Sequence, residues 1–142
     1  MTIRETALQA AREWIGTPYH HRARVKGAGC DCLMLIIDAY TAAGLIAGDY
    51  IAPEYPADIM FHSDDSGYLD GVMAICDEVE TPMPGDIAMW KFGKTWSHGA
   101  IVSDWPCVIH AYGPYRAVVE MSVNEDRRLS SRPVRFFSPR GI

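Results

Sequence analysis

Cysteine and histidine are the side chains whose placement in this sequence indicates covalent chemistry. Cys32 stands at the start of a long apolar segment, where a helix is expected to begin. A helix start carries unpaired N–H groups and the positive end of the helix dipole, and cysteines so placed have pKa values of about 3.5–7.5. The glycines upstream allow backbone amides to approach closely enough to hold an oxyanion. Cys32 is therefore a candidate nucleophile, although buried free cysteine is also a common core residue.

Two histidines are candidates for the general base and the orienting group that a nucleophilic cysteine needs. His98 lies just before one expected strand and His110 lies within the next, with Ser103-Asp104-Trp105-Pro106 between them as a turn. If Ser103 pairs with Pro106, His98 falls opposite Ala111, and a pairing one residue tighter puts it opposite His110. Directly opposed residues have Cβ atoms about 5 Å apart, so such a hairpin can place the two imidazoles side by side.

The loop ahead of Cys32 contributes three further polar side chains. Tyr19 either turns its hydroxyl into the site or packs as an ordinary tyrosine, and His20 and His21 are expected at the surface. A rival interpretation takes Cys30 and Cys32 with the two histidines as zinc ligands. Structural zinc sites usually separate paired cysteines by two to four residues, and these two are separated by one, so the pattern fits zinc poorly.

Two helices are expected to position these groups. Thr2-Ile3-Arg4-Glu5 matches a capping box, and the apolar spacing that follows predicts a helix over about residues 3–15, ended by Gly16 and Pro18. A second helix is expected from Asp31 or Cys32 to Ala43, with Gly44 as its stop. It is apolar on nearly every side, which is typical of a buried central helix.

The rest of the chain indicates a sheet. Residues 45–66 appear irregular in pattern, with prolines and a polar serine–aspartate cluster, and the spacing from Tyr68 to Val79 predicts a weaker third helix. After a turn at Pro84-Gly85-Asp86, short strands are expected over 87–92, 99–103, 107–112, 117–121 and 134–137. Helices first and strands later indicate one α+β domain over residues 1–142, with an antiparallel sheet.

Composition narrows the function classes. The chain has 142 residues, 49% hydrophobic and 22% charged, with a net charge of −5. Its pI of about 5.4 argues against a nucleic-acid binder, which usually has a domain pI above about 9. No apolar run approaches the roughly 20 residues that span a bilayer, so no membrane insertion is expected. The first residues lack a signal-peptide layout, so we expect cytoplasmic synthesis and reduced cysteines.

Five segments in one order resemble the NlpC/P60 family of cell-wall cysteine peptidases, whose fold is papain-like, and the resemblance runs from about residue 3 to residue 122. The segments are Gly16-Thr17-Pro18-Tyr19, Asp31-Cys32, Pro84-Gly85-Asp86-Ile87, Ser97-His98-Gly99-Ala100-Ile101-Val102 and Val108-Ile109-His110-Ala111. Gly29-Cys30-Asp31-Cys32-Leu33 is most similar to the phage-encoded branch, whose members sit among tail genes. The resemblance implies a nucleophile at the start of a buried helix packed on an antiparallel sheet.

The resemblance also implies roles. Cys32 would be the nucleophile, with Cys30 as the other candidate, His98 the general base and His110 the orienting residue. Tyr19, Asp31 and Leu33 would line the substrate or oxyanion site, and no metal or cofactor would be needed. The substrate would be a peptidoglycan stem peptide, cut between γ-D-glutamate and a diamino acid. Phage tail proteins would be partners, in a particle that acts on the cell wall.

One departure from the family motif leaves alternatives open. The motif continues from cysteine into serine and glycine, and here Leu33 and Met34 stand in their places. Leucine cannot donate the hydrogen bond that serine gives to substrate, and methionine narrows the cleft or alters packing. One alternative is a weakly active or inactive phage tail assembly module on the same fold. The other is an amidase or acyltransferase that uses the same cysteine and histidines.

Overall fold

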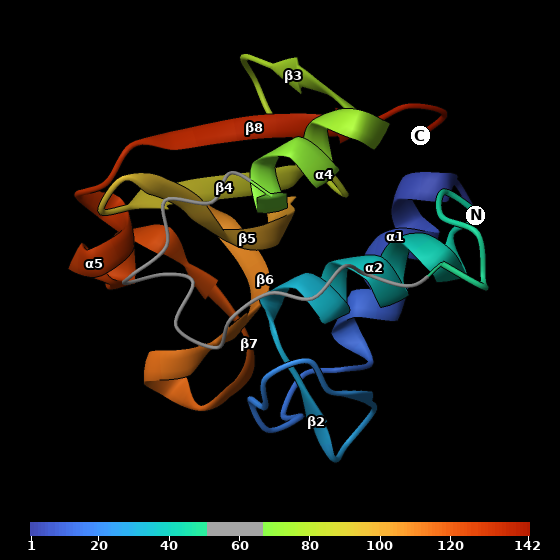
Figure 1. Ribbon diagram of the computed structural model, residues 1–142, viewed down its shortest axis with the longest axis horizontal. Helices are drawn as coiled ribbons and strands as arrows, with labels where there is room; N and C mark the ends of the chain where they lie inside the picture. The colour runs from blue at the N-terminus through green and yellow to red at the C-terminus, as the bar shows by residue number, and fades with distance from the viewer. Residues whose placement is uncertain (51–66) are drawn as a thin grey trace.

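The computed structural model describes residues 1–50 and 67–142 as helices packed on a six-stranded antiparallel sheet (Figure 1). The expected α+β architecture is therefore confirmed. The sheet order is β3-β8-β4-β5-β6-β7. The strands are β3 (Cys76–Val79), β4 (Ile87–Phe92), β5 (Thr95–Asp104), β6 (Cys107–Tyr112), β7 (Ala117–Ser122) and β8 (Val134–Pro139). The helices are α1 (Ile3–Arg12), α2 (Cys32–Ala42), α4 (Gly67–Ile75) and α5 (Arg127–Ser130).

Helix α1 begins as its sequence predicts and ends earlier. The Thr2 hydroxyl accepts the N–H of Glu5, and the Glu5 carboxylate accepts the N–H of Thr2, which completes the capping box. The helix ends at Arg12, short of the predicted residue 15. The reason is that the chain turns toward the sheet, where the N–H of Gly16 donates to the carbonyl of Val118 at 2.9 Å.

Helix α2 is the buried central helix that its composition predicts. The carboxylate of Asp31 caps it by accepting the N–H of Met34 at 2.9 Å. At the other end Gly44 has φ +77, a left-handed conformation that glycine adopts without steric cost. The helix packs between α1 and the strands β5 and β6, so its apolar surface is covered on several sides.

The third helix is shorter than predicted. Helix α4 ends at Ile75, and residues 76–79 form the edge strand β3, which pairs with β8. The guanidinium of Arg140 donates to the carbonyls of Met73, Ala74 and Cys76, so a distant residue satisfies the last carbonyls of this helix. Residues 51–66, the larger part of the segment expected to be irregular, lie outside the described residues.

Two further short strands lie in the loop ahead of α2, which was predicted without them. Strands β1 (Arg24–Val25) and β2 (Gly29–Cys30) pair with each other, and Tyr19 bridges to Cys30. No helix in the described ranges, 1–50 and 67–142, is long and apolar enough to cross a membrane.

Strands β4 and β6 have the predicted bounds, and β5 starts earlier, so His98 lies inside it. The register between β5 and β6 differs from both predicted pairings. Ile101 pairs with Ile109 and Asp104 with Cys107, across a two-residue turn, with an irregularity between Val102 and Asp104. His98 and His110 are thus diagonal neighbours on the same face, and both predicted partners of His98, Ala111 and His110, are wrong.

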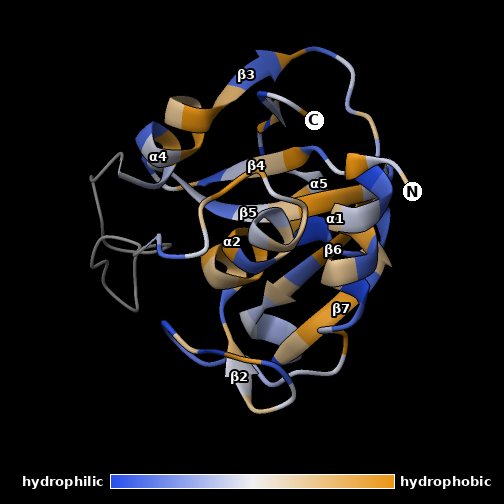
Figure 2. Ribbon diagram, turned by 90° about the vertical axis from the view of Figure 1, so that its right-hand side faces the viewer, coloured by the Kyte–Doolittle hydropathy of each residue, from blue (hydrophilic) through white to orange (hydrophobic). Residues whose placement is uncertain are grey.

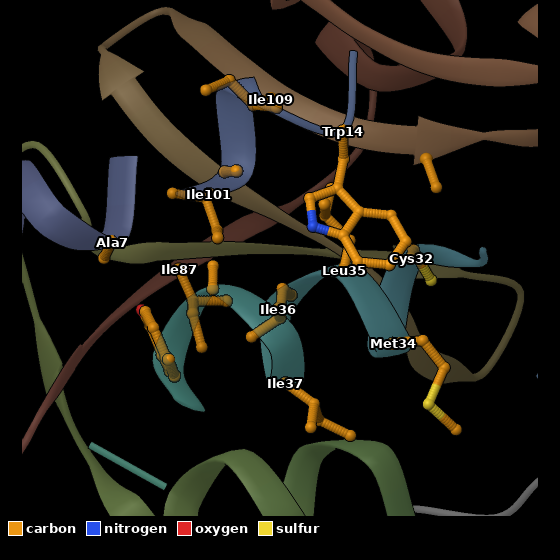
Figure 3. Close-up of a cluster of buried hydrophobic side chains, with 14 of the residues drawn as sticks. Ala7, Trp14, Cys32, Met34, Leu35, Ile36, Ile37, Ile87, Ile101 and Ile109 are labelled. Carbon is orange, nitrogen blue, oxygen red and sulfur yellow. The ribbon is translucent and has the colours of Figure 1, made fainter. Parts of the chain in front are cut away.

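The sheet separates two hydrophobic clusters. One cluster joins the inner faces of the helices to residues such as Met89, Ile101 and Ile109 (Figure 3). The other covers the opposite face and includes Trp90, Phe92 and Tyr112. Figure 2 shows α1 and α2 in front of the sheet, with hydrophobic colour visible along β4 and β7 behind them. Side chains that alternate along a strand therefore enter different cores.

Asp86 joins the turn before β4 to two distant segments of the chain. Its buried carboxylate accepts from the Arg4 guanidinium at 2.8 Å, from the N–H of Met83 at 2.8 Å and from the Ser138 hydroxyl at 2.5 Å. Tyr40 donates to the adjacent carbonyl of Gly85 at 2.7 Å. The Pro-Gly-Asp segment thus joins α1, α2 and β8.

We expect Asp86→Ala to lower the free energy of unfolding by about 3 kcal/mol, because it leaves a partly buried guanidinium and a hydroxyl without their acceptor. Urea denaturation measures the loss. The matched control is Asp77→Ala, because Asp77 is exposed and its ion pair with Arg140 lies at the surface. That control should change the stability by less than about 1 kcal/mol, and equal losses in both variants would contradict the prediction.

Candidate active site

The thiol of Cys32 lies at the first residue of α2 and is nearly buried, with a relative exposure of 6%. Three donors surround its sulfur: the N–H of Leu33, the N–H of Gly99 and the hydroxyl of Tyr68. The thiol is therefore held between the helix start, strand β5 and helix α4.

Burial, and after it the negative charge of Asp31, raise the pKa of the Cys32 thiol to about 12, against the three donors that lower it. This corrects the expected low thiol pKa. The helix start does supply N–H donors, but burial and the adjacent carboxylate outweigh them. In this conformation the thiol is protonated at neutral pH.

We expect iodoacetamide to alkylate Cys32 in the folded protein far more slowly at pH 7 than it alkylates an exposed cysteine. A pKa near 12 leaves roughly a thousandfold less thiolate than the ordinary value near 9. Mass spectrometry of the Cys32 peptide from pH 6 to pH 10 measures the rate, with urea-unfolded protein as the control. A plateau reached by pH 7 would show a low-pKa thiol instead.

His98 on β5 and His110 on β6 form a buried pair. Nε2 of His98 lies 2.8 Å from Nδ1 of His110, a hydrogen-bond distance. His98 packs on Trp90 and Tyr112, with ring centroids at 5.6 and 5.2 Å, and the ring of His110 stacks on Tyr112 at 4.6 Å. Aromatic neighbours thus fix both imidazole planes.

Burial lowers the pKa of both histidines, that of His98 well below its ordinary value and that of His110 to about 3. The second imidazole lowers the pKa of His98 further, whereas the carboxylate of Asp126 raises that of His110. Two neutral rings at 2.8 Å share one hydrogen. When Nε2 of His98 carries it, Nδ1 of His98 has a free lone pair, which is the electronic state of a general base.

The structure brings the two histidines together, and it places the thiol against the backbone of Gly99, the residue after His98. His98 pairs with Trp90 and shares its face of the sheet, while Cys32 belongs to the cluster on the helix face. The pairing between β5 and β6 begins only at Ile101. Two residues earlier, the N–H of Gly99 on β5 meets the Cys32 sulfur at the first turn of α2. Within residues 1–50 and 67–142 no hydrogen bond joins Cys32 to either histidine.

Tyr68 is a site residue that sequence reasoning placed only on a weak helix. Its hydroxyl contacts the Cys32 sulfur, and a Cβ built on Gly99 would lie far inside contact distance of the same oxygen. The signal in the sequence was Gly99 itself, a glycine directly after His98 at the start of a predicted strand. A residue without a side chain on a buried strand allows this close approach.

We expect Gly99→Ala to destabilise the protein by about 1–3 kcal/mol, because the new methyl group overlaps the Tyr68 hydroxyl and also crowds Ile36. In a Tyr68→Phe background, which lacks that hydroxyl, the same change should cost less. Urea denaturation of the four proteins of this double-mutant cycle measures the coupling. Identical costs in both backgrounds would refute the overlap as the cause.

The other predicted site residues lie around the thiol. Tyr19 is half-buried, and burial together with the charges of Cys32 and Asp31 raises its phenol pKa, so it keeps its proton. The carboxylate of Asp31 accepts the N–H groups of Met34 and Arg22, at 2.9 and 2.7 Å, so it positions the loop as well as the helix. Leu33 lines an apolar cavity on the α4 side.

Three neighbouring expectations have mixed outcomes. His20 is exposed as expected, whereas His21 is only half-exposed, with its Nδ1 3.8 Å from the Asp31 carboxylate. Met34 is buried in the helix-side core. In the part of the chain that the structure describes, no three His, Cys, Asp or Glu side chains gather as a metal site requires, so the zinc interpretation gains no support.

Solved structures with the same architecture decide the fold. The NlpC/p60 domain of the peptidoglycan hydrolase SagA superposes with a TM-score of 0.63 at 18% identity, covering 93% of this chain and 96% of that one. The chain has the NlpC/P60 fold. NlpC1 from Trichomonas vaginalis superposes with a TM-score of 0.69 at 16% identity, over 97% of this chain, which spans only 44% of that protein. By sequence, no family model and no curated protein matches.

The NlpC/P60 fold does not by itself imply catalysis. RipD from Mycobacterium tuberculosis superposes with a TM-score of 0.62 at 14% identity, over 100% of this chain and 99% of that one. It is described as a non-catalytic NlpC/p60 domain protein adapted to peptidoglycan binding. Whether a chain with this fold acts as a hydrolase must therefore be argued from its own residues.

Proposed function

We propose that this protein is a cysteine peptidase that hydrolyses an amide bond in peptidoglycan stem peptides. The observation that carries the proposal is the buried His98–His110 hydrogen bond of 2.8 Å. The residue that follows His98 in the chain, Gly99, donates its N–H to the Cys32 thiol. A base, a group that orients it and a thiol at a helix start are the parts that nucleophilic amide hydrolysis needs. Similarity to the SagA domain supports the substrate class.

In the proposed mechanism Cys32 first leaves its three donors by rotation about its Cα–Cβ bond. Nδ1 of His98 takes the thiol proton, and the sulfur attacks the amide carbonyl. The N–H groups that held the sulfur, at Leu33 and Gly99, become free to stabilise the oxyanion. His98 then protonates the leaving amine, and water hydrolyses the thioester. His110 holds His98 in the productive tautomer throughout.

The finer assignments are also part of the proposal. The scissile bond is the one between γ-D-glutamate and the diamino acid, and the protein acts from a phage or prophage tail on the cell wall. The segment from Gly29 to Leu33 supports the phage assignment by its resemblance to that branch. Tail proteins supply the targeting to the wall.

The direct test is incubation of the purified protein with defined stem peptides, followed by chromatography and mass spectrometry of the products. We expect two fragments separated at the γ-D-glutamyl bond. Cleavage at another amide would contradict the proposed scissile bond and would still support the peptidase activity. Absence of any cleavage of stem peptides or intact peptidoglycan, at high protein concentration and from pH 6 to pH 9, would refute the proposal.

A non-catalytic binding or assembly module is the second candidate, favoured by the buried, protonated thiol and its lack of a hydrogen bond to His98. It predicts sedimentation of the protein with insoluble peptidoglycan or tail proteins, unchanged in Cys32→Ala. It also predicts that no thioester forms on Cys32 with an activated acyl substrate. Trapping such a thioester by mass spectrometry at low pH would exclude the inert-module alternative.

A further inference from the structure

A cavity of about 240 Å³ lies between α2, α4 and the segment that follows α2. Leu33, Ile36 and Ile37 contribute its α2 wall, and Tyr68 and Val72 its α4 wall. Figure 3 shows Ile37 pointing from α2 toward the neighbouring α4. None of the described residues that line the cavity carries a charge.

The cavity shares two of its lining residues with the surroundings of the candidate catalytic thiol. Leu33 follows Cys32 in the chain and donates its N–H to the sulfur, while its side chain lines the cavity. Tyr68 likewise contacts the sulfur through its hydroxyl and lines the cavity. The cavity therefore adjoins the residues that contact the Cys32 sulfur.

We propose that this cavity binds an aliphatic acyl chain whose carbonyl carbon Cys32 attacks, so that the site accepts acyl groups with a medium-length hydrocarbon tail. The inference rests on the proposed nucleophilic role of Cys32 and adds an aliphatic acyl substrate to the proposed stem peptide, whose charged γ-D-glutamyl group would lie outside this cavity. Among the described lining residues a charged acyl side chain would lose its hydration without gaining an opposite charge, whereas a hydrocarbon chain gains from burial. The exchange of the motif's serine for Leu33 fits the same preference, because leucine adds apolar wall where serine adds a polar group.

The chemistry is a two-step acyl transfer. The bond from sulfur to the carbonyl carbon forms, the bond from that carbon to the leaving nitrogen or oxygen breaks, and the thiol proton passes through His98 to the leaving group. Water then adds to the thioester and releases the free acid and the thiol. Neither step requires an oxidant or a cofactor.

The test uses p-nitrophenyl esters with acyl chains from two to eight carbons and the full-length protein. Transfer of one methylene from water to an apolar site favours binding by about fourfold. We expect the rate of Cys32 acylation, followed by p-nitrophenolate release and the mass of the thioester, to rise by about that factor per methylene until the cavity is full.

Gly71 offers a variant that fills the cavity. It lies on the α4 face that lines the cavity, and a Cβ built there meets nothing within 4 Å. Gly71→Leu should therefore fold, since leucine also favours the helix. It should lower the rate of Cys32 acylation by the eight-carbon ester at least tenfold, which flattens the dependence of the rate on chain length. Gly71→Ala is the matched control and should keep the dependence. A flat dependence in the unaltered protein, or the same dependence in Gly71→Leu, would overturn the inference.

Binding without chemistry separates this inference from the proposed function. Octanamide is an uncharged probe, and its affinity for Cys32→Ala protein is measured by calorimetry, with and without Gly71→Leu. Octanamide binding that Gly71→Leu weakens, together with no acylation of the unaltered protein, would refute the nucleophile and keep the cavity as an aliphatic site. Acylation at one rate for all chain lengths would keep the nucleophile and refute the acyl site.

Discussion

Cys32→Ala is expected to lower the turnover of a stem-peptide amide by roughly 10⁴-fold or more, because removal of a nucleophile abolishes the covalent route. The variant should still fold, since alanine fits the space of a nearly buried cysteine and keeps the Asp31 cap on α2. Steady-state hydrolysis, with circular dichroism as the check on folding, measures the effect.

Cys30→Ala is the matched control for that experiment. Cys30 is fully buried in β2, two residues before the candidate nucleophile, and burial also raises its pKa to about 12. Its replacement should keep the rate within about tenfold. The assignment of the nucleophile would be wrong if Cys30→Ala lost activity while Cys32→Ala retained it.

The second large effect is a loss of stability in mild acid. Both His98 and His110 have folded-state pKa values lowered below the ordinary 6.5, so the folded state keeps them neutral while the unfolded chain binds their protons. Their stabilisation is fully present above pH 6.5 and falls as pH drops from there toward the folded pKa. Between pH 8 and pH 5 each histidine should lose about 2 kcal/mol.

Urea denaturation at pH 8, 7, 6 and 5 tests this linkage. The paired variant His98→Gln with His110→Gln should have a nearly flat stability over the same range, because glutamine does not titrate. The range stops at pH 5 so that carboxylates with lowered pKa values, such as those of Glu120 and Asp126, stay ionised. A pH-independent stability of the unaltered protein would contradict the burial of neutral imidazoles.

Elements whose signals are local could be predicted from the sequence. The capping box at Thr2, the start of the second helix at Cys32 and the stop at Gly44 each depend on a few neighbouring residues, and the structure confirms them. The strands at 87–92 and 107–112 also have their predicted bounds, since a short apolar run bounded by turn residues is readable along one strand.

Features that depend on distant residues could not be predicted. The end of α4 depends on Arg140 near the other end of the chain, and β3 exists because β8 offers it an edge. The register of β5 on β6 depends on an irregularity near Ser103 that no turn signal marks. The observed register is two residues from the tighter of the two predicted pairings, so it leaves the histidines on one face, because the side-chain period of a strand is two.

The candidate site shows the same division. Cys32 at a helix start and two adjacent imidazoles follow from local pattern, and the structure places them so. The contribution of Tyr68 and the high thiol pKa follow from how α4 and β5 close over the helix start. Burial is a property of the assembled molecule, so local sequence predicted the dipole and missed the larger opposing effect.

The protonated resting state of Cys32 also bears on how long the molecule survives. Peroxide converts cysteine to sulfenic acid through the thiolate, so a buried thiol with a pKa near 12 is oxidised slowly. Burial of the sulfur thus preserves a reactive group in an oxidising environment. Reactivity appears only when the side chain leaves its buried position, which couples the chemical durability of the protein to the arrival of its substrate.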